Sequence, residues 1–216
     1  MKKIIFLFVI IINVFMIYVV TLNKNIYYLS LGDYMALGVN NQMRITGGYN
    51  TYIKNYLQKK DKLKLFNDEF VVNNYHTTDL INDILDNKKV DATIQNALIK
   101  ADITSLSIGN NDLLFELQGT NNFDEIINDI DELFGLIRKY TKEEVIVNSF
   151  HYPYDVKIDD IEKKVIFMNE RLNELCDKYH FIYNDIYDIV EGNYPTDKNY
   201  EKIGENIVKK SFLSNI

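Results

Sequence analysis

Short apolar runs alternate with amphipathic patterns along most of this 216-residue chain. Buried strands joined by helices favour a parallel sheet with helices on both faces, connected by right-handed crossovers. The sequence therefore predicts a three-layer αβα domain over residues 25–216. The expected strands are 26–31, 70–74, 103–108, 145–149 and 181–183, and the expected helices are 47–59, 78–85, 92–98, 123–140, 157–179 and 197–210.

Polar residues follow several of the predicted strands directly. In an open α/β sheet, functional groups gather beyond the carboxyl ends of the strands, which meet at one edge. Residues in these positions can contact one another although they are far apart in the sequence. The candidate ligand-binding residues are therefore Asp33, Tyr34, His76, Asn111 and His151.

The first 24 residues form a separate unit. Residues 4–22 contain no charged side chain, and as a helix they reach roughly 28 Å, about the thickness of a hydrocarbon core. Lys2 and Lys3 precede this run, which predicts that the N-terminus stays in the cytoplasm. Because no small-residue cleavage site follows, we expect an uncleaved single-pass membrane anchor with residues 25–216 outside. The alternative is a cleaved signal peptide and a secreted domain.

Composition excludes several classes of function. Lys and Arg number 24 against 31 Asp and Glu, so the formal net charge is −7. This balance argues against nucleic-acid binding, and against adhesion of the domain to anionic lipid through its net charge. The single cysteine, Cys176, excludes an intrachain disulfide and a Cys-based zinc site. We expect no cofactor and no metal, and the sequence does not predict an oligomeric state.

Several blocks of sequence, in order, resemble one known family. Residues 31–38 read LGDYMALG, residues 107–112 read SIGNND, and residues 194–203 read YPTDKNYEKI. Together with 145–153 and 168–172, they resemble the SGNH, or GDSL-type, hydrolases over roughly residues 26–211. The resemblance implies a flavodoxin-like αβα fold and the hydrolysis of esters or acyl groups.

The chain departs from this family where the chemistry should occur. The family's nucleophilic Ser falls on Tyr34, its base His on Tyr194, and the Asp that precedes the His on Glu191. Asn111 matches the side-chain oxyanion donor, but no Gly lies near residues 74–77 to match the second backbone donor. The resemblance thus assigns Tyr34, Asn111, Glu191 and Tyr194 to the catalytic positions.

A phenol at either position removes the family's chemistry. Tyr34 is neutral at pH 7 and bulky, and Tyr194 cannot act as a base. We therefore expect a catalytically degenerate protein whose vestigial cleft binds an acyl, ester or glycan ligand or a partner protein, or is simply plugged. The alternative is an active ester or acyl hydrolase in which His76 or His151 serves as a relocated base.

Overall fold

The computed structural model describes residues 25–86, 93–119, 122–151, 160–190 and 192–216. The expected anchor at residues 1–24, and Glu191, lie outside these ranges. Within them, no helix is both long enough and apolar enough to cross a membrane.

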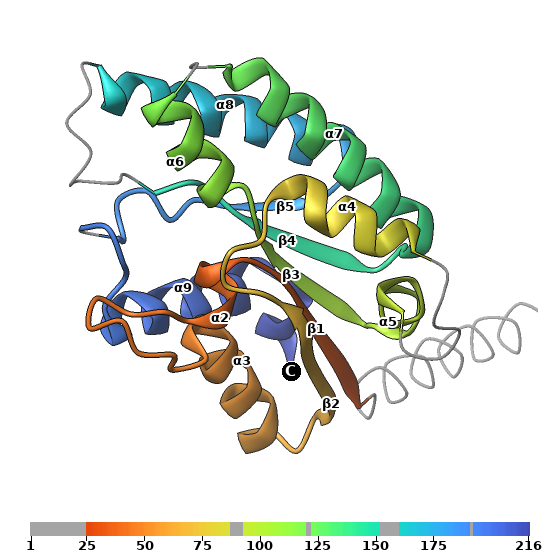
Figure 1. Ribbon diagram of the computed structural model, residues 1–216. Helices are drawn as coiled ribbons and strands as arrows, with labels where there is room; N and C mark the ends of the chain where they lie inside the picture. Colours follow the sequence, from red (N-terminus) through yellow and green to blue (C-terminus); the bar gives the residue numbers. More distant parts are fainter. Residues whose placement is uncertain (1–24, 87–92, 120–121, 152–159, 191) are drawn as a thin grey trace, which may run out of the picture.

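A five-stranded parallel sheet forms the middle layer (Figure 1). The strand order β2-β1-β3-β4-β5 is the doubly wound, flavodoxin-like order. The predicted central sheet is thus confirmed. Its strands are β1 (Ile26–Gly32), β2 (Leu63–Val71), β3 (Ile103–Ser107), β4 (Glu144–Asn148) and β5 (Ile182–Asn184).

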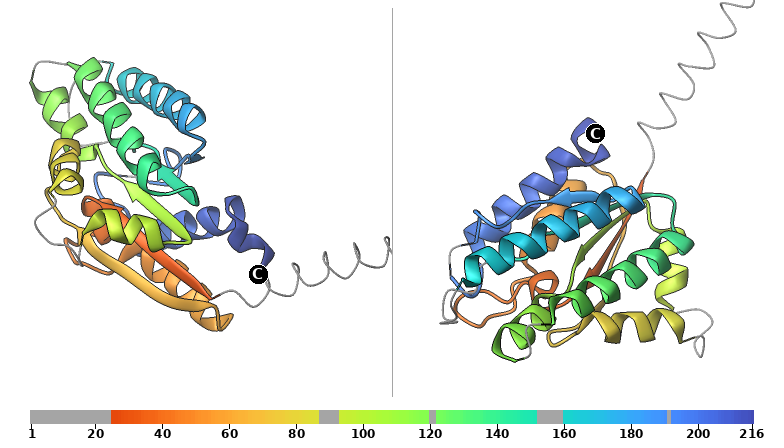
Figure 2. Two further views of the ribbon diagram at one scale, coloured as in Figure 1. Left: turned by 90° about the vertical axis from the view of Figure 1, so that its right-hand side faces the viewer. Right: turned by 90° about the horizontal axis from the view of Figure 1, so that it is seen from above.

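Helices cover both faces of the sheet, which completes the predicted three layers (Figures 1 and 2). One face packs against α3 (Gly48–Lys59) and α9 (Asp197–Lys210), with the short 3-10 helix η1 (Phe212–Asn215). The other face packs against α4 (Thr77–Leu85), α5 (Ile94–Lys100), α7 (Phe123–Tyr140) and α8 (Ile161–Tyr179). Two more helices, α2 (Tyr34–Leu37) and α6 (Asn110–Gln118), directly follow the ends of β1 and β3.

Successive side chains of β1 point to opposite faces of the sheet and pack into two separate parts of the hydrophobic core. Tyr27, Leu29 and Leu31 pack toward the α4–α8 face, whereas Ile26 and Tyr28 pack toward α3 and α9. All of β1 is buried, as expected for a central strand covered on both sides.

The second strand is where the sequence prediction was wrong. We expected a strand at residues 70–74, but β2 begins at Leu63 and ends at Val71. It is an edge strand with one partner, β1, so its outer residues stay half-buried or exposed and include Lys64, Asp68 and Glu69. Such a strand lacks the continuous apolar run by which the other strands were predicted.

Gly32 permits the closest approach of β1 to β3. Its φ is +132°, and a Cβ atom there would lie 1.9 Å from the carbonyl oxygen of Ser107. The same oxygen accepts a hydrogen bond from the Asp33 amide at 2.9 Å. Any side chain at position 32 would therefore push apart the two strands that carry the site.

We expect Gly32→Ala to lower the free energy of unfolding by about 3 kcal/mol, from backbone strain and the clash together. Gly192→Ala is the matched control, because Gly192 has a φ of +100° but no atom within 4 Å of the added Cβ. It should cost only about 1 kcal/mol. Equal losses in chemical denaturation would show that the contact with Ser107 contributes nothing.

Candidate active site

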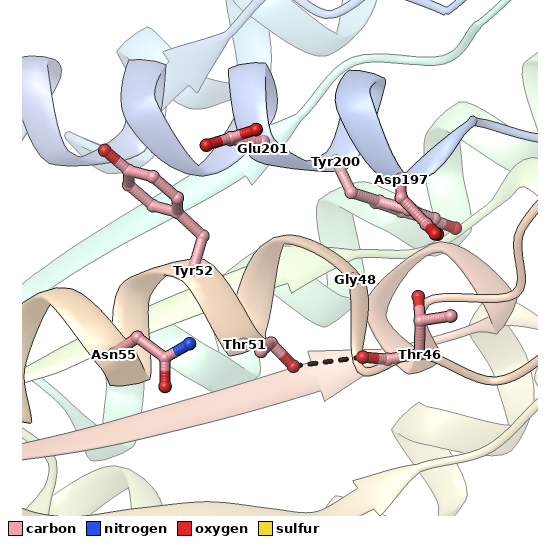
Figure 3. Close-up of a pocket in the computed structure, with 8 residues that line it drawn as sticks. All are labelled: Thr46, Gly48, Thr51, Tyr52, Asn55, Asp197, Tyr200 and Glu201. Atoms are coloured by element: carbon pink, nitrogen blue, oxygen red, sulfur yellow. Dashed lines mark hydrogen bonds between the residues drawn. The ribbon is translucent and has the colours of Figure 1, made fainter.

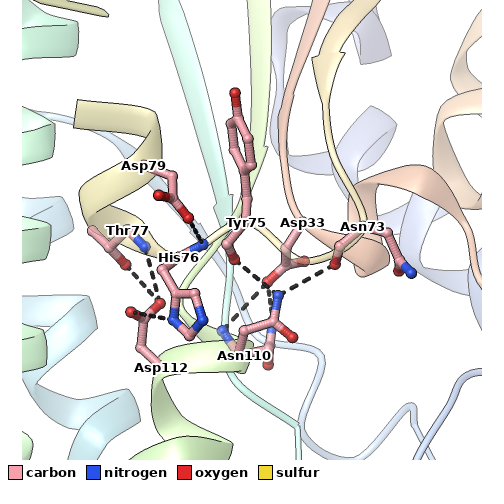
Figure 4. A network of polar contacts seen from close by, with 9 residues as sticks. Asp33, Asn73, Tyr75, His76, Thr77, Asp79, Asn110 and Asp112 are labelled. Atoms are coloured by element: carbon pink, nitrogen blue, oxygen red, sulfur yellow. Dashed lines mark hydrogen bonds and ion pairs between the residues drawn. The ribbon is translucent and has the colours of Figure 1, made fainter. Parts of the chain in front are cut away.

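Asp33 ties together the ends of the two central strands (Figure 4). One carboxylate oxygen caps α2 by accepting from the Met35 amide at 3.0 Å. The other accepts from the backbone amide of Asn110 at 3.3 Å, where α6 begins after β3. Through these bonds Asp33 supports the turns that follow β1 and β3. Because its side chain is completely buried, it offers no surface to a ligand.

Burial raises the pKa of Asp33 to about 7. The hydrogen bonds from Met35 and Asn110 favour the charged form and oppose this effect, but desolvation is the larger influence. The folded protein therefore holds a proton on this carboxyl under conditions in which an exposed aspartate has lost it.

Tyr34 and Tyr194, which the sequence resemblance assigns to the positions of the nucleophile and its base, are in contact. Their ring centroids are 5.4 Å apart and the rings are edge to face, at an angle of 67°. Tyr34 is only 5% exposed, while Tyr194 is half-buried. Burial raises the pKa of Tyr34 well above the usual range of a phenol, with the neighbouring Asp33 adding to the effect. The Tyr34 side chain is thus a neutral, packed group.

His151 is the third member of this aromatic cluster. Its Nε2 lies 3.4 Å from the Tyr34 hydroxyl and 3.0 Å from the carbonyl oxygen of Asn193. A carbonyl oxygen can only accept, so Nε2 carries the proton and the basic lone pair is on Nδ1. That atom is buried and has no hydrogen-bond partner among the described residues. Burial also lowers the pKa of His151. In this tautomer His151 cannot take a proton from Tyr34 through Nε2.

Asn111 lies in the first turn of α6 and faces the loop after β2. Its side-chain amide donates to the carbonyl oxygens of Asn73 at 3.3 Å and Tyr75 at 2.8 Å. Both amide hydrogens are therefore used within the protein. A role for Asn111 as a donor to a ligand oxygen stays a prediction, and it would require the loop to release the amide.

His76 pairs with Asp112 next to this loop (Figure 4). Its Nδ1 lies 3.1 Å from Asp112 Oδ1, and the other carboxylate oxygen accepts from the amide and hydroxyl of Thr77. A carboxylate holds the proton on Nδ1, so Nε2 carries the lone pair. The His76 side chain is 44% exposed and borders a pocket of about 160 Å³ that Thr78 and Phe115 also line. This pair has the orientation of a histidine base.

A larger groove of about 270 Å³ lies between α3 and α9 (Figure 3). Tyr52 and Glu201 face each other across it, and Thr51 and Asn55 line its α3 side. The buried Tyr200 also lines the groove and donates its hydroxyl to the Val39 carbonyl at 2.8 Å, but neither Tyr34 nor Tyr194 is among the lining residues. The groove is thus distinct from the predicted catalytic positions.

The structure brings the candidate residues together in two neighbouring groups. Tyr34, Tyr194 and His151 form one, His76 and Asn111 belong to the other, and Asp33 lies between them. The sequence analysis did not predict the pairing of Asp112 with His76. The neighbouring carboxyl ends of β2, β1 and β3 could have indicated this contact, because His76 and Asp112 both follow them closely.

The pH dependence of stability tests the environment of Asp33. The unfolded chain releases this proton near pH 4, and the folded protein near pH 7. The folded state therefore binds more protons between these values, and the contribution of Asp33 to stability falls as the pH rises through them. Relative to Asp33→Asn, the wild type should lose about 2 kcal/mol of unfolding free energy between about pH 5 and pH 7.5.

Asp124→Asn removes an exposed carboxylate in the first turn of α7 and serves as the control. Its denaturation midpoints should follow the wild type across the same pH range. Parallel curves for the wild type and Asp33→Asn would show that Asp33 is ionised in the folded protein throughout.

Solved structures of ester hydrolases share this architecture. The lipase Lip_vut3 from a goat rumen metagenome superposes with a TM-score of 0.71 and 17% identity, over 88% of this chain and 100% of its own. A putative lipolytic protein of the G-D-S-L family from Desulfitobacterium hafniense superposes with a TM-score of 0.63 and 13% identity, over 86% of this chain and 99% of its own. Axe2, an acetylxylan esterase from Geobacillus stearothermophilus, superposes with a TM-score of 0.67 and 13% identity, over 88% of this chain and 95% of its own.

No protein-family model matches the sequence, and no curated protein sequence matches it. The likeness therefore rests on the course of the backbone, and at these identities it shows the fold and not the activity. The resemblance inferred from the sequence blocks is confirmed at that level: the chain has the fold of the SGNH, or GDSL-type, hydrolases.

Proposed function

We propose that this chain is a catalytically degenerate SGNH-fold protein, anchored in a membrane by residues 4–22, with its domain outside. It binds an acyl, ester or glycan ligand, or a partner protein, at the edge of the former cleft. The observation that carries the proposal is the buried edge-to-face contact of Tyr34 with Tyr194.

This contact opposes hydrolysis in two ways. A serine nucleophile needs a base that accepts its proton, whereas Tyr34 is a buried phenol with a raised pKa. The nearest imidazole, that of His151, presents a protonated nitrogen to it. An edge-to-face aromatic pair also contributes about 0.5–1.5 kcal/mol beyond the burial of its area, so opening the cleft has a cost.

The anchoring is supported by the sequence of residues 4–22 and by the Lys2-Lys3 pair before it. The alternative is cleavage near residue 20 and secretion of the domain. In both cases residues 25–216 are exported, and the single thiol, Cys176, is buried where it cannot form an interchain disulfide.

A second candidate function rests on His76. Its side chain is half-exposed beside a pocket, and its Nδ1 pairs with Asp112, the arrangement by which a carboxylate orients a catalytic imidazole. In this reading the chain is an ester or acyl hydrolase in which His76 activates a water molecule. The active Asp-His pair would then lie at the starts of α4 and α6, away from Tyr34 and Tyr194.

We expect the purified protein to hydrolyse neither p-nitrophenyl acetate nor acetylated xylan. Tyr34→Ser/Tyr194→His restores both a hydroxyl and a base, and should raise turnover about 10²-fold above the control Tyr34→Ser/Tyr194→Phe, which opens similar space without a base. Full restoration is not expected, because the loop near residues 74–77 has no Gly donor. Wild-type turnover that Asn111→Ala abolishes would overturn the proposal.

The second candidate predicts turnover in the wild type that depends on His76. His76→Asn retains a side chain able to donate to Asp112 but lacks a base, so the rate should fall about 10²-fold or more. The exposed His180, beyond the end of α8, provides the control His180→Asn, which should leave the rate unchanged. Equal rates in all three proteins would exclude His76 as the base.

A further inference from the structure

Exposed lysines gather at the edge of the sheet opposite the candidate site, where the strands begin. Several occupy the last turns of helices, and others lie beyond the helix ends, in β2 and in the loop before β4. We call this surface the basic edge. It consists of Lys59, Lys60, Lys64, Lys100, Lys139, Lys142, Lys209 and Lys210, all of them exposed.

Carboxylates at this edge offset part of this positive charge, and two of them are held by backbone amides. Asp102 and Glu144 accept hydrogen bonds from the backbone amides of Tyr27 and Phe212, which engages them within the protein. The other acidic residues at this edge include Asp61, Asp86, Glu143 and Asp177, together with Glu205, whose carboxylate lies 4.0 Å from the Lys209 ammonium.

The opposite edge is acidic. The first turns of the helices that begin there carry Asp79, Asp112, Asp124, Glu125, Glu162 and Asp197. The net charge of −7 therefore conceals a separation of charge between the two edges, and the expectation that net charge prevents adhesion to anionic lipid does not describe this surface. Helix dipoles account for the lysines in last turns. They do not account for Lys64 in β2 or Lys142 in a loop.

The hydrophobic run joins the domain at this same edge. It ends at Leu22, and β1 begins at Ile26, so the three residues between them span at most about 10 Å. The end of the chain lies here too: the Tyr56 hydroxyl donates to the Leu213 carbonyl at 3.0 Å, and Figure 2 shows the C-terminus on the side where β1 starts. An anchored domain thus keeps the basic edge within about one or two Debye lengths of the headgroups.

We propose that the basic edge is a membrane-docking surface that lies against the anionic phospholipid headgroups of the bilayer holding residues 4–22. This inference rests on the proposed anchor. It fixes the orientation of the domain, because β1 runs away from the bilayer for about 20 Å before it reaches Tyr34. The candidate site then faces away from the membrane, and its ligand or partner approaches from the surroundings and not from the lipid beneath.

The test uses the full chain in two kinds of nanodisc, one of phosphatidylcholine and one with about a third of phosphatidylglycerol. Amine acetylation, read by mass spectrometry, reports the accessibility of each lysine. The basic-edge lysines should react at least about 3-fold more slowly in the anionic discs, and salt at about 0.5 M should remove the difference. Lys163 and Lys198, near the starts of α8 and α9, should react equally in both.

A charge-reversed variant makes the comparison specific. Lys60→Glu/Lys64→Glu/Lys142→Glu should abolish the lipid-dependent protection of the remaining basic-edge lysines. Lys163→Glu/Lys198→Glu/Lys202→Glu, with the same change in charge elsewhere, should preserve it. Thermal unfolding of both variants shows that each one is folded.

Flotation separates this inference from the anchor on which it rests. If the chain fails to float with neutral vesicles after a high-salt wash, the anchor is wrong and the docking surface falls with it. If the chain floats but its basic-edge lysines react equally in both kinds of disc, the anchor stands and the docking surface is overturned.

Discussion

All five strands run in the same direction, so a helix that returns the chain to the start of the next strand must run the opposite way. The ends of these helices are thereby sorted between two edges of the sheet. Their N-termini meet at the edge where Asp33, His76 and Asn111 lie, and their C-termini meet where β1 begins. This constraint places the candidate site at one edge of the sheet, and it places the lysines of the helix C-termini at the other.

The polar groups at the carboxyl edge mostly bind other parts of the protein. Asp33 accepts from amides at the starts of α2 and α6, and Asn111 donates to the loop after β2. Around Tyr34, the rings of His151 and Tyr194 pack edge to face against the phenol. The only imidazole there, His151, is buried and has its proton on the nitrogen nearest Tyr34. His76, whose partner is a carboxylate, has the opposite tautomer and is accessible.

The sequence predicts the parts of this structure that depend on continuous apolar runs. The buried strands β1, β3 and β4 carry such runs, and so their positions follow from the pattern. β2 does not, because all of its residues are half-buried or exposed and charged residues interrupt the apolar ones, and α2 is too short to show a period. The contact between Tyr34 and Tyr194 could be predicted, because the sequence blocks at 31–38 and 194–203 resemble two motifs that meet in the SGNH fold. The proton position on His151 could not be predicted, since it depends on the Asn193 carbonyl, a backbone group that no side chain identifies.

Charge distribution, unlike net charge, could be derived only once the direction of each helix was known. Lys59 and Lys139 end different helices, and Lys64 lies in a strand, yet a parallel sheet brings all three to one surface. An acidic protein can therefore present a basic face to an anionic membrane while its candidate site lies among carboxylates. That separation gives the edge that holds the candidate site a charge of its own. An acidic rim at the far edge repels anionic ligands, so neutral esters, neutral glycans or a basic partner fit its charge better than free carboxylates do.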